Sequence, residues 1–184
     1  MIYLTGDTHG EFDRIEDFCE EYETTTDDVL VILGDAGINF YLDGRDDELK
    51  ERLSRLPITL LCIHGNHEER PDEIHGYEEM PWRGGSVLCQ PDYPNILFAW
   101  DGAVYDFGGK KAIAIGGAYS VDKLYRLTNG LSWFPTEQPD AVIKNRVEQK
   151  LDQLGWQVDY VFSHTVPLHA IPSHALLSST DQNT

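Results

Sequence analysis

The chain has 184 residues, 41% of them hydrophobic and 25% charged, and its formal net charge is −18. This composition predicts one soluble domain spanning residues 1–184, and the acidic excess argues against non-specific nucleic-acid binding, which requires Lys and Arg against phosphates. No apolar run approaches the roughly 20 residues of a membrane-spanning helix, and the chain starts directly in a predicted strand, so we expect no secretory signal and a cytoplasmic location.

The cysteines also bear on the compartment. Cys19, Cys62 and Cys89 are widely spaced and form no Cys-x-x-Cys pair. An odd number at such spacing argues against both a disulfide framework and a zinc knuckle. We therefore expect reduced thiols, in keeping with a cytosolic protein.

The first third of the chain alternates between two kinds of pattern. Apolar runs predict strands at residues 2–5, 29–33 and 58–63, and apolar residues at three- and four-residue spacings predict helices at 11–23 and 45–56. Strands and helices in this order form a parallel sheet with right-handed crossovers.

The remainder of the chain predicts short strands punctuated by Gly and Pro, then one helix and a last strand. Asp101-Gly102 and Gly108-Gly109 are typical of hairpin turns. Residues 72–85 and 128–139 are expected to be long loops, which often carry function. The natural packing for this order is two layers of sheet with helices outside. The expected elements are strands at 87–88, 96–99, 103–107 and 111–115, a helix at 141–154 and a strand at 158–162.

Residues able to bind metal follow four of the predicted strands. They supply two carboxylates, one amide and three imidazoles, from Asp7, His9, Asp35, Asn66, His67 and His164. Open α/β sheets build their sites where strands end. A mixed nitrogen and oxygen set suits Mn, Fe or Zn rather than Ca.

The spacing of these residues suits two cations. In extended backbone Asp7 and His9 share a face, so both could reach one ion. Asp35 could bridge two ions, since a two-metal hydrolase holds its cations about 3.5–4 Å apart. Asn66 and His164 could complete the second ion. The His67 side chain should point away from Asn66, toward a substrate, where it could protonate a leaving oxygen.

Four motifs together resemble those of the calcineurin-like metallophosphoesterases: Asp7-x-His9, Gly34-Asp35, Gly65-Asn66-His67-Glu68 and Ser163-His164-Thr165. The resemblance runs from residue 1 to about residue 170. It implies an α/β protein with a four-layer αββα fold, in which two mixed β-sheets are flanked by helices. It also implies hydrolysis of phosphomonoesters or phosphodiesters by metal-activated hydroxide.

The resemblance further implies a dinuclear centre with divided ligands. Asp7, His9 and Asp35 would hold the first divalent metal ion, and Asp35, Asn66 and His164 the second. His67 would be catalytic, assisting the leaving group. The motifs Gly-Asp-x-His-Gly and Gly-Asn-His-Glu are also similar to those of the protein Ser/Thr phosphatase branch of the family.

One departure from the family concerns its C-terminal motif. The family usually ends in Gly-His-x-His, and this chain contains no Gly-His dipeptide. We therefore expect a C-terminally truncated domain in which each metal lacks one ligand, unless His169 or His174 substitutes. The alternative function is a catalytically inactive metal-binding or interaction module of the same fold.

A second departure concerns the residues after Gly34-Asp35. Protein phosphatases place Asp and Arg shortly after this dipeptide, and the segment up to Asn39 contains neither. The usual partner of the leaving-group histidine is therefore missing, unless Asn39 or Asp43 takes that place.

Residues 116–126 supply a candidate for substrate binding. This segment resembles one found in small bacterial or phage-type members of the family. Arg126 could bind a phosphate bidentately, or be a solvated arginine. His64 and His75 are expected to be structural or exposed. We expect a phosphoester substrate and no long nucleic acid; the sequence leaves the oligomeric state and the particular ester open.

Overall fold

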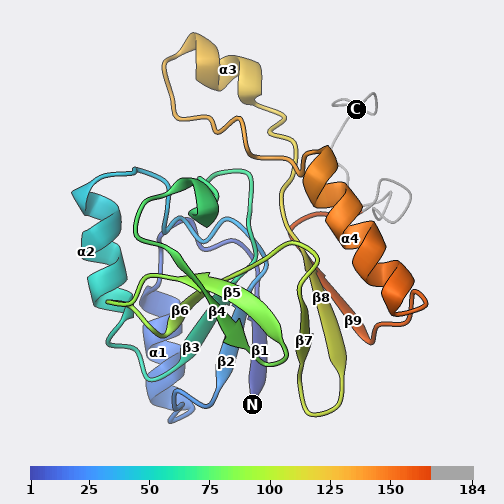
Figure 1. Cartoon of the computed structure of the whole chain (residues 1–184). Helices are drawn as coiled ribbons and strands as arrows, with labels where there is room; N and C mark the ends of the chain where they lie inside the picture. The colour runs from blue at the N-terminus through green and yellow to red at the C-terminus, as the bar shows by residue number, and fades with distance from the viewer. Residues whose placement is uncertain (167–184) are drawn as a thin grey trace, which may run out of the picture.

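The computed structural model describes residues 1–166, and its larger sheet has six strands (Figure 1). Their spatial order is β1 (Ile2–Thr5), β2 (Val29–Ile32), β3 (Thr59–Cys62), β6 (Ile96–Ala99), β5 (Gly85–Cys89) and β4 (Glu78–Trp82). The first four pair in parallel, and β5 and β4 add antiparallel. The predicted parallel sheet is therefore present, with an antiparallel edge.

The smaller sheet has three strands. Strand β7 (Val104–Asp106) pairs antiparallel with β8 (Lys111–Ile115), which pairs in parallel with β9 (Tyr160–Ser163). Helix α4 (Ala141–Gln153) connects β8 to β9 and runs along the side of this sheet away from the larger one (Figure 1). Both sheets are thus mixed.

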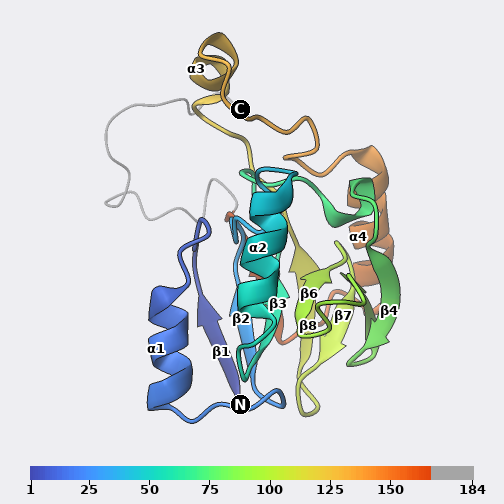
Figure 2. The ribbon, with the colours of Figure 1, turned by 90° about the vertical axis from the view of Figure 1, so that its left-hand side faces the viewer.

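Alternation along the central strands produces two cores. Leu30 and Ile32 of β2 pack with helix α1 (Asp13–Glu21) and helix α2 (Gly44–Leu53), which cover one face of the larger sheet (Figure 2). Val29 and Val31 of the same strand face the smaller sheet. Successive strand residues point to opposite faces, so a fully apolar strand is needed where both faces are covered. The order helix, sheet, sheet, helix confirms the expected fold class.

Two sequence expectations were wrong. Residues 72–85 are not a loop, because they contain a short 3₁₀ helix (Pro71–Glu73) and strand β4. Strand β4 lies at the edge of its sheet and is mostly exposed, so it lacks an apolar alternation, and its Pro81 is tolerated only at an edge. Asp101-Gly102 is not a hairpin turn, because β6 and β7 belong to different sheets. The turn at Gly108-Gly109 does join an antiparallel pair.

Residues 121–133, which we call the α3 arm, extend away from both sheets in Figures 1 and 2. The arm contains helix α3 (Lys123–Thr128), in which no residue is buried. Its two ends are fixed, because Ser120 and Phe134 are buried. The sequence placed this helix in no predicted element, since a helix without a buried face leaves no apolar periodicity.

Cys19, Cys62 and Cys89 are buried and free. No helix among residues 1–166 is long and apolar enough to cross a membrane.

The packing between the sheets can be tested with one pair of substitutions. Leu61 is fully buried between the sheets, whereas Leu124 on α3 is 79% exposed. We expect Leu61→Ala to lower the free energy of unfolding by about 3 kcal/mol, because it leaves a cavity, and Leu124→Ala to change it by less than about 0.5 kcal/mol. Urea unfolding of both variants measures this, and equal losses would contradict the assigned core.

Candidate metal centre

The candidate ligands come from loops that begin where β1, β2, β3 and β9 end. Asp7 and His9 follow β1, Asp35 follows β2, Asn66 follows β3 and His164 follows β9. Ligands more than 150 residues apart in sequence are thereby within one cluster, since His164 Nδ1 lies 3.8 Å from Asp7 Oδ1. The sheets therefore bring together the residues that the sequence selected.

The backbone of the first two loops is held in an unusual conformation. His9 and Asp35 both have a φ of +48°, which costs free energy in residues other than Gly. The Asp35 carbonyl compensates by accepting hydrogen bonds from the amides of Thr8 and His9, at 3.1 and 2.8 Å. The two loops are thus joined directly beneath the ligands.

Glycines in the motifs are required by close approach. A Cβ on Gly34 would lie 2.1 Å from the His164 ring, and Gly34 itself has a φ of +94°. A Cβ on Gly65 would lie 2.0 Å from Asp35 Oδ1. Both separations are far below van der Waals contact, so only Gly permits the ligands to approach this closely.

The two oxygens of Asp35 have different surroundings. Oδ1 accepts hydrogen bonds from the backbone amides of Asn66 and His67, at 2.8 and 2.9 Å. Oδ2 lies 3.9 Å from His9 Nε2 and 3.6 Å from His164 Nε2. The side chain is only 4% exposed. One oxygen therefore orients the carboxylate, while the other faces an imidazole on each side.

The hydrogen bonds of His164 and Asn66 leave two acceptors facing each other. Leu33 O lies 2.8 Å from His164 Nδ1, so Nδ1 carries the proton and Nε2 has a free lone pair. The Asn66 amide donates from Nδ2 to Ser120 Oγ at 2.9 Å, which leaves Oδ1 as an acceptor. Nε2 and Oδ1 are only 2.9 Å apart. When Nε2 carries no proton, a shared cation would stabilise these two acceptors, so the donor set fits a metal ion.

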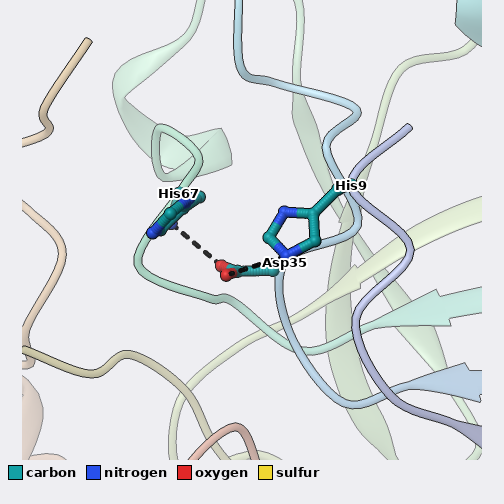
Figure 3. Close-up of side chains that lie close together, drawn as sticks. All are labelled: His9, Asp35 and His67. Atoms are coloured by element: carbon teal, nitrogen blue, oxygen red, sulfur yellow. Dashed lines mark hydrogen bonds and ion pairs between the residues drawn. The ribbon is translucent and has the colours of Figure 1, made fainter. Parts of the chain in front are cut away.

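A second grouping includes His67 (Figure 3). One ligand atom from each of His9, Asp35 and His67 lies within 4.8 Å of the other two. In Figure 3 the Asp35 carboxylate lies between the two imidazoles. His67 is thus as close to this group as a ligand would be, a position that the sequence did not predict.

Arg126 contacts His67 across 59 residues of sequence, with its Nη2 3.0 Å from Nδ1. The same Nη2 lies 3.4 Å from Nε2, and a guanidinium can only donate, so it donates to whichever ring nitrogen of a neutral His67 carries no proton. Burial lowers the pKa of His67 and so favours the neutral ring, although the charge of Asp35 opposes this shift more strongly than the charge of Arg126 adds to it. Asp122 holds Arg126 in place by accepting from Nε at 2.7 Å. The Arg126 side chain is 15% exposed, so it is not a freely solvated arginine.

The proposed substitutes for the missing acid lie elsewhere. Asn39 is fully buried and accepts a hydrogen bond from Tyr77. Asp43 caps helix α2 and pairs with Arg45. Within residues 1–166, neither forms a hydrogen bond or ion pair with His67.

His64 is buried, as expected, and has no hydrogen-bond partner on either ring nitrogen among the described residues. His169 and His174 lie outside the described residues.

The match to a family model agrees with this geometry. The calcineurin-like phosphoesterase model matches residues 1–177, nearly the whole chain. The chain belongs to the calcineurin-like phosphoesterase family. Proteins of this family act on phosphoester substrates and typically bind divalent metal ions, and the His and Asp group described above provides a possible metal site. No curated protein and no solved structure matches the chain.

Glu68 of this calcineurin-like phosphoesterase directly follows His67 in the chain and was assigned no role from the sequence. Its side chain is fully buried and accepts from the amides of Gly37 and Gly65, at 3.2 and 3.0 Å. It therefore ties the loop after β2 to the loop after β3. The sequence feature that could have predicted this burial is the place of Glu68 within the Gly-Asn-His-Glu motif, although Glu is usually exposed.

The ionisation of Glu68 should be visible in stability. Burial raises the pKa of Glu68 to about 7 from a usual value near 4.5, despite the two amide donors. The folded state then binds an extra proton between these values, so this contribution to stability is present at low pH and is lost as the pH rises through 7. In the presence of chelator, we expect wild type to gain about 2 kcal/mol more than Glu68→Gln between pH 7.5 and pH 5.

Urea unfolding at both pH values measures this difference. Glu148→Gln, at an exposed position on α4, is the matched control and should follow wild type. Parallel pH dependences for wild type and Glu68→Gln would show that Glu68 ionises normally in the folded protein.

Proposed function

We propose that this protein hydrolyses phosphoesters with a dinuclear metal centre. Asp7, His9 and Asp35 would hold one divalent ion, and Asp35, Asn66 and His164 the other. The observation that carries this proposal is the convergence of acceptors: Asp35 Oδ2 lies between two imidazole nitrogens, and His164 Nε2 lies 2.9 Å from Asn66 Oδ1. A divalent ion placed among these atoms would share their lone pairs and offset the charge of Asp35.

The ions, of Mn, Fe or Zn, would lower the pKa of a bound water and neutralise phosphoryl charge. The protein's own contribution is orientation. Ser120 fixes the Asn66 amide so that its oxygen faces His164, and Leu33 O fixes the ring of His164. Residues that orient ligands in this way typically change metal affinity 10- to 100-fold when removed.

His67 is proposed as the proton donor to the leaving oxygen. A neutral His67 that accepts from Arg126 at one ring nitrogen carries its proton on the other, where it is available for transfer. Because a neutral ring that accepts from Arg126 has no further free lone pair, this contact also favours proton transfer over metal binding for His67. Arg126 is proposed to contact the phosphoryl oxygens, since its guanidinium adjoins His67 and can bind two oxygens at once.

The decisive test is Asp35→Asn. This change preserves the shape of the side chain but removes its charge, so we expect the loss of at least one equivalent of metal and a fall in turnover of 100-fold or more, on the order of 3 kcal/mol. Metal content is measured beside hydrolysis of p-nitrophenyl phosphate and bis-p-nitrophenyl phosphate in Mn²⁺. The ratio of the two rates also distinguishes a monoesterase from a diesterase.

The control for this test is Asp17→Asn, an exposed carboxylate on α1. It should retain wild-type metal content and turnover. If Asp35→Asn kept full activity with metal present, the proposed centre would be wrong.

The proposed contact between Arg126 and the substrate phosphate is tested separately, through KM. We expect Arg126→Ala to raise KM about tenfold with metal content unchanged, and Arg126→Lys to lie between, because Lys keeps the charge but not the planar fork. Steady-state kinetics measure both, and Arg55→Ala, an exposed arginine on the surface, is the control. An unchanged KM for Arg126→Ala would refute phosphate binding by this residue.

A further inference from the structure

A cavity of about 320 Å³ adjoins the candidate metal centre. His9 and His67 line one end, and Phe40, Tyr41, Arg45 and Leu49 line the part near helix α2. A substrate phosphate bound at the centre would therefore have this cavity beside the histidine proposed to protonate the leaving oxygen.

The cavity is formed in advance by a buried carboxylate. Asp46 is 3% exposed and accepts hydrogen bonds from the backbone amides of Tyr41 and Leu42, at 3.1 and 2.7 Å. These bonds hold Leu42 at a φ of +56°. The Tyr41 backbone is therefore fixed, and a preformed site spends less free energy on ordering when a ligand binds.

Aromatic contacts fix the wall as well. The Phe40 ring lies edge-on to Tyr41, with centroids 4.9 Å apart, and edge-on to Phe134 at 6.2 Å. Phe134 is buried at the end of the α3 arm. The Phe40 ring thus contacts Tyr41 on one side and Phe134, next to the α3 arm, on the other, and these two contacts fix its position.

The charged groups in the cavity are already paired. The Arg45 guanidinium lies 3.7 Å above the Tyr41 ring and donates to Asp43 through Nε and Nη2. Asp46 accepts from backbone amides. What remains for a ligand is aromatic and aliphatic surface, from Phe40, Tyr41 and Leu49. Such a lining favours a planar apolar group over a sugar or a charged group.

From this geometry we propose that the cavity binds the leaving group of the substrate, and that the substrate is a small phosphomonoester whose alcohol carries one aromatic ring. This inference rests on the proposed hydrolase function. The volume is at the lower end for ligand sites, which limits the group to about one ring. Hydrolysis breaks the bond between phosphorus and the alcohol oxygen, transfers one water oxygen to phosphorus, and returns one proton to the alcohol through His67.

The test compares benzyl phosphate with methyl phosphate, whose leaving alcohols have similar acidities. We expect the Mn²⁺-loaded protein to show a kcat/KM about tenfold or more higher for benzyl phosphate, because only that ester buries a ring. Tyr41→Ala should reduce this ratio several-fold, whereas Tyr41→Phe should preserve it. Tyr41 is 48% exposed, so both variants are expected to fold, and circular dichroism checks this.

A binding measurement makes the test independent of turnover. Calorimetric titration with benzylphosphonate and methylphosphonate should show the same preference in wild type, reduced in Tyr41→Ala. Tyr22→Ala is the matched control, because Tyr22 is exposed to a similar degree beside α1 and lines no part of this cavity.

The outcomes separate the two proposals. Hydrolysis of both esters with equal kcat/KM would overturn the aromatic site and leave the hydrolase standing. Equal affinities for the two phosphonates would overturn the site even if neither ester were hydrolysed. If the wild-type protein neither bound metal nor hydrolysed either ester, the proposed function itself would be refuted.

Discussion

The arrangement of the candidate centre depends on how Asp35 is held. Its carboxylate is buried, which is costly unless every lone pair has a partner. One oxygen takes both amides of the loop after β3, and the other is left facing two imidazoles. Satisfying this single group therefore fixes the loop that carries Asn66 and His67. It also explains why Gly65 lacks a side chain, since a Cβ there would collide with the same carboxylate.

The net negative charge of the whole chain affects how a phosphate can be bound at the candidate centre. A chain with a net charge of −18 cannot readily attract a phosphate, so a cationic group must be delivered to the centre. Arg126 arrives there on the α3 arm, oriented by Asp122 and by the carbonyl of Ser132. The arm is held at its base by Arg70, which donates to Thr136 O and pairs with the buried Asp101. Because Arg70 closely follows His67 in the chain, one loop supports both the proposed proton donor and its cationic neighbour.

The sequence predicted best where local pattern and tertiary environment agree. Strands β2 and β3 are buried on both faces, so their unbroken apolar runs identified them, and the polar residues that follow each strand supplied the candidate ligands. Prediction failed where tertiary context decides. Strand β4 is exposed at an edge, and the turn at Asp101-Gly102 carries the chain from one sheet to the other instead of closing a hairpin.

Contacts between distant segments were equally invisible to local pattern. Nothing near Asn66 in sequence points to Ser120, and nothing near His67 points to Arg126, since these pairs are 54 and 59 residues apart. Arg126 itself was selected only because its segment resembled one in other family members. The partner of His67 was sought in Asn39 and Asp43, where the motif order of protein phosphatases would place it. The structure brings a cation to that ring instead, from an arm that the local pattern did not reveal as an element.

His67 is the point at which these features meet. The guanidinium of Arg126 contacts its ring nitrogens, and the ring also borders the aromatic cavity beside helix α2. A cation suits the phosphoryl oxygens, whereas an apolar wall suits the alcohol that leaves. Burial of the ring lowers the pKa of His67, and a neutral ring that accepts from Arg126 at one nitrogen carries its proton on the other. The chemical polarity of a phosphoester, charged at one end and apolar at the other, therefore matches the polarity of the surroundings of this one side chain.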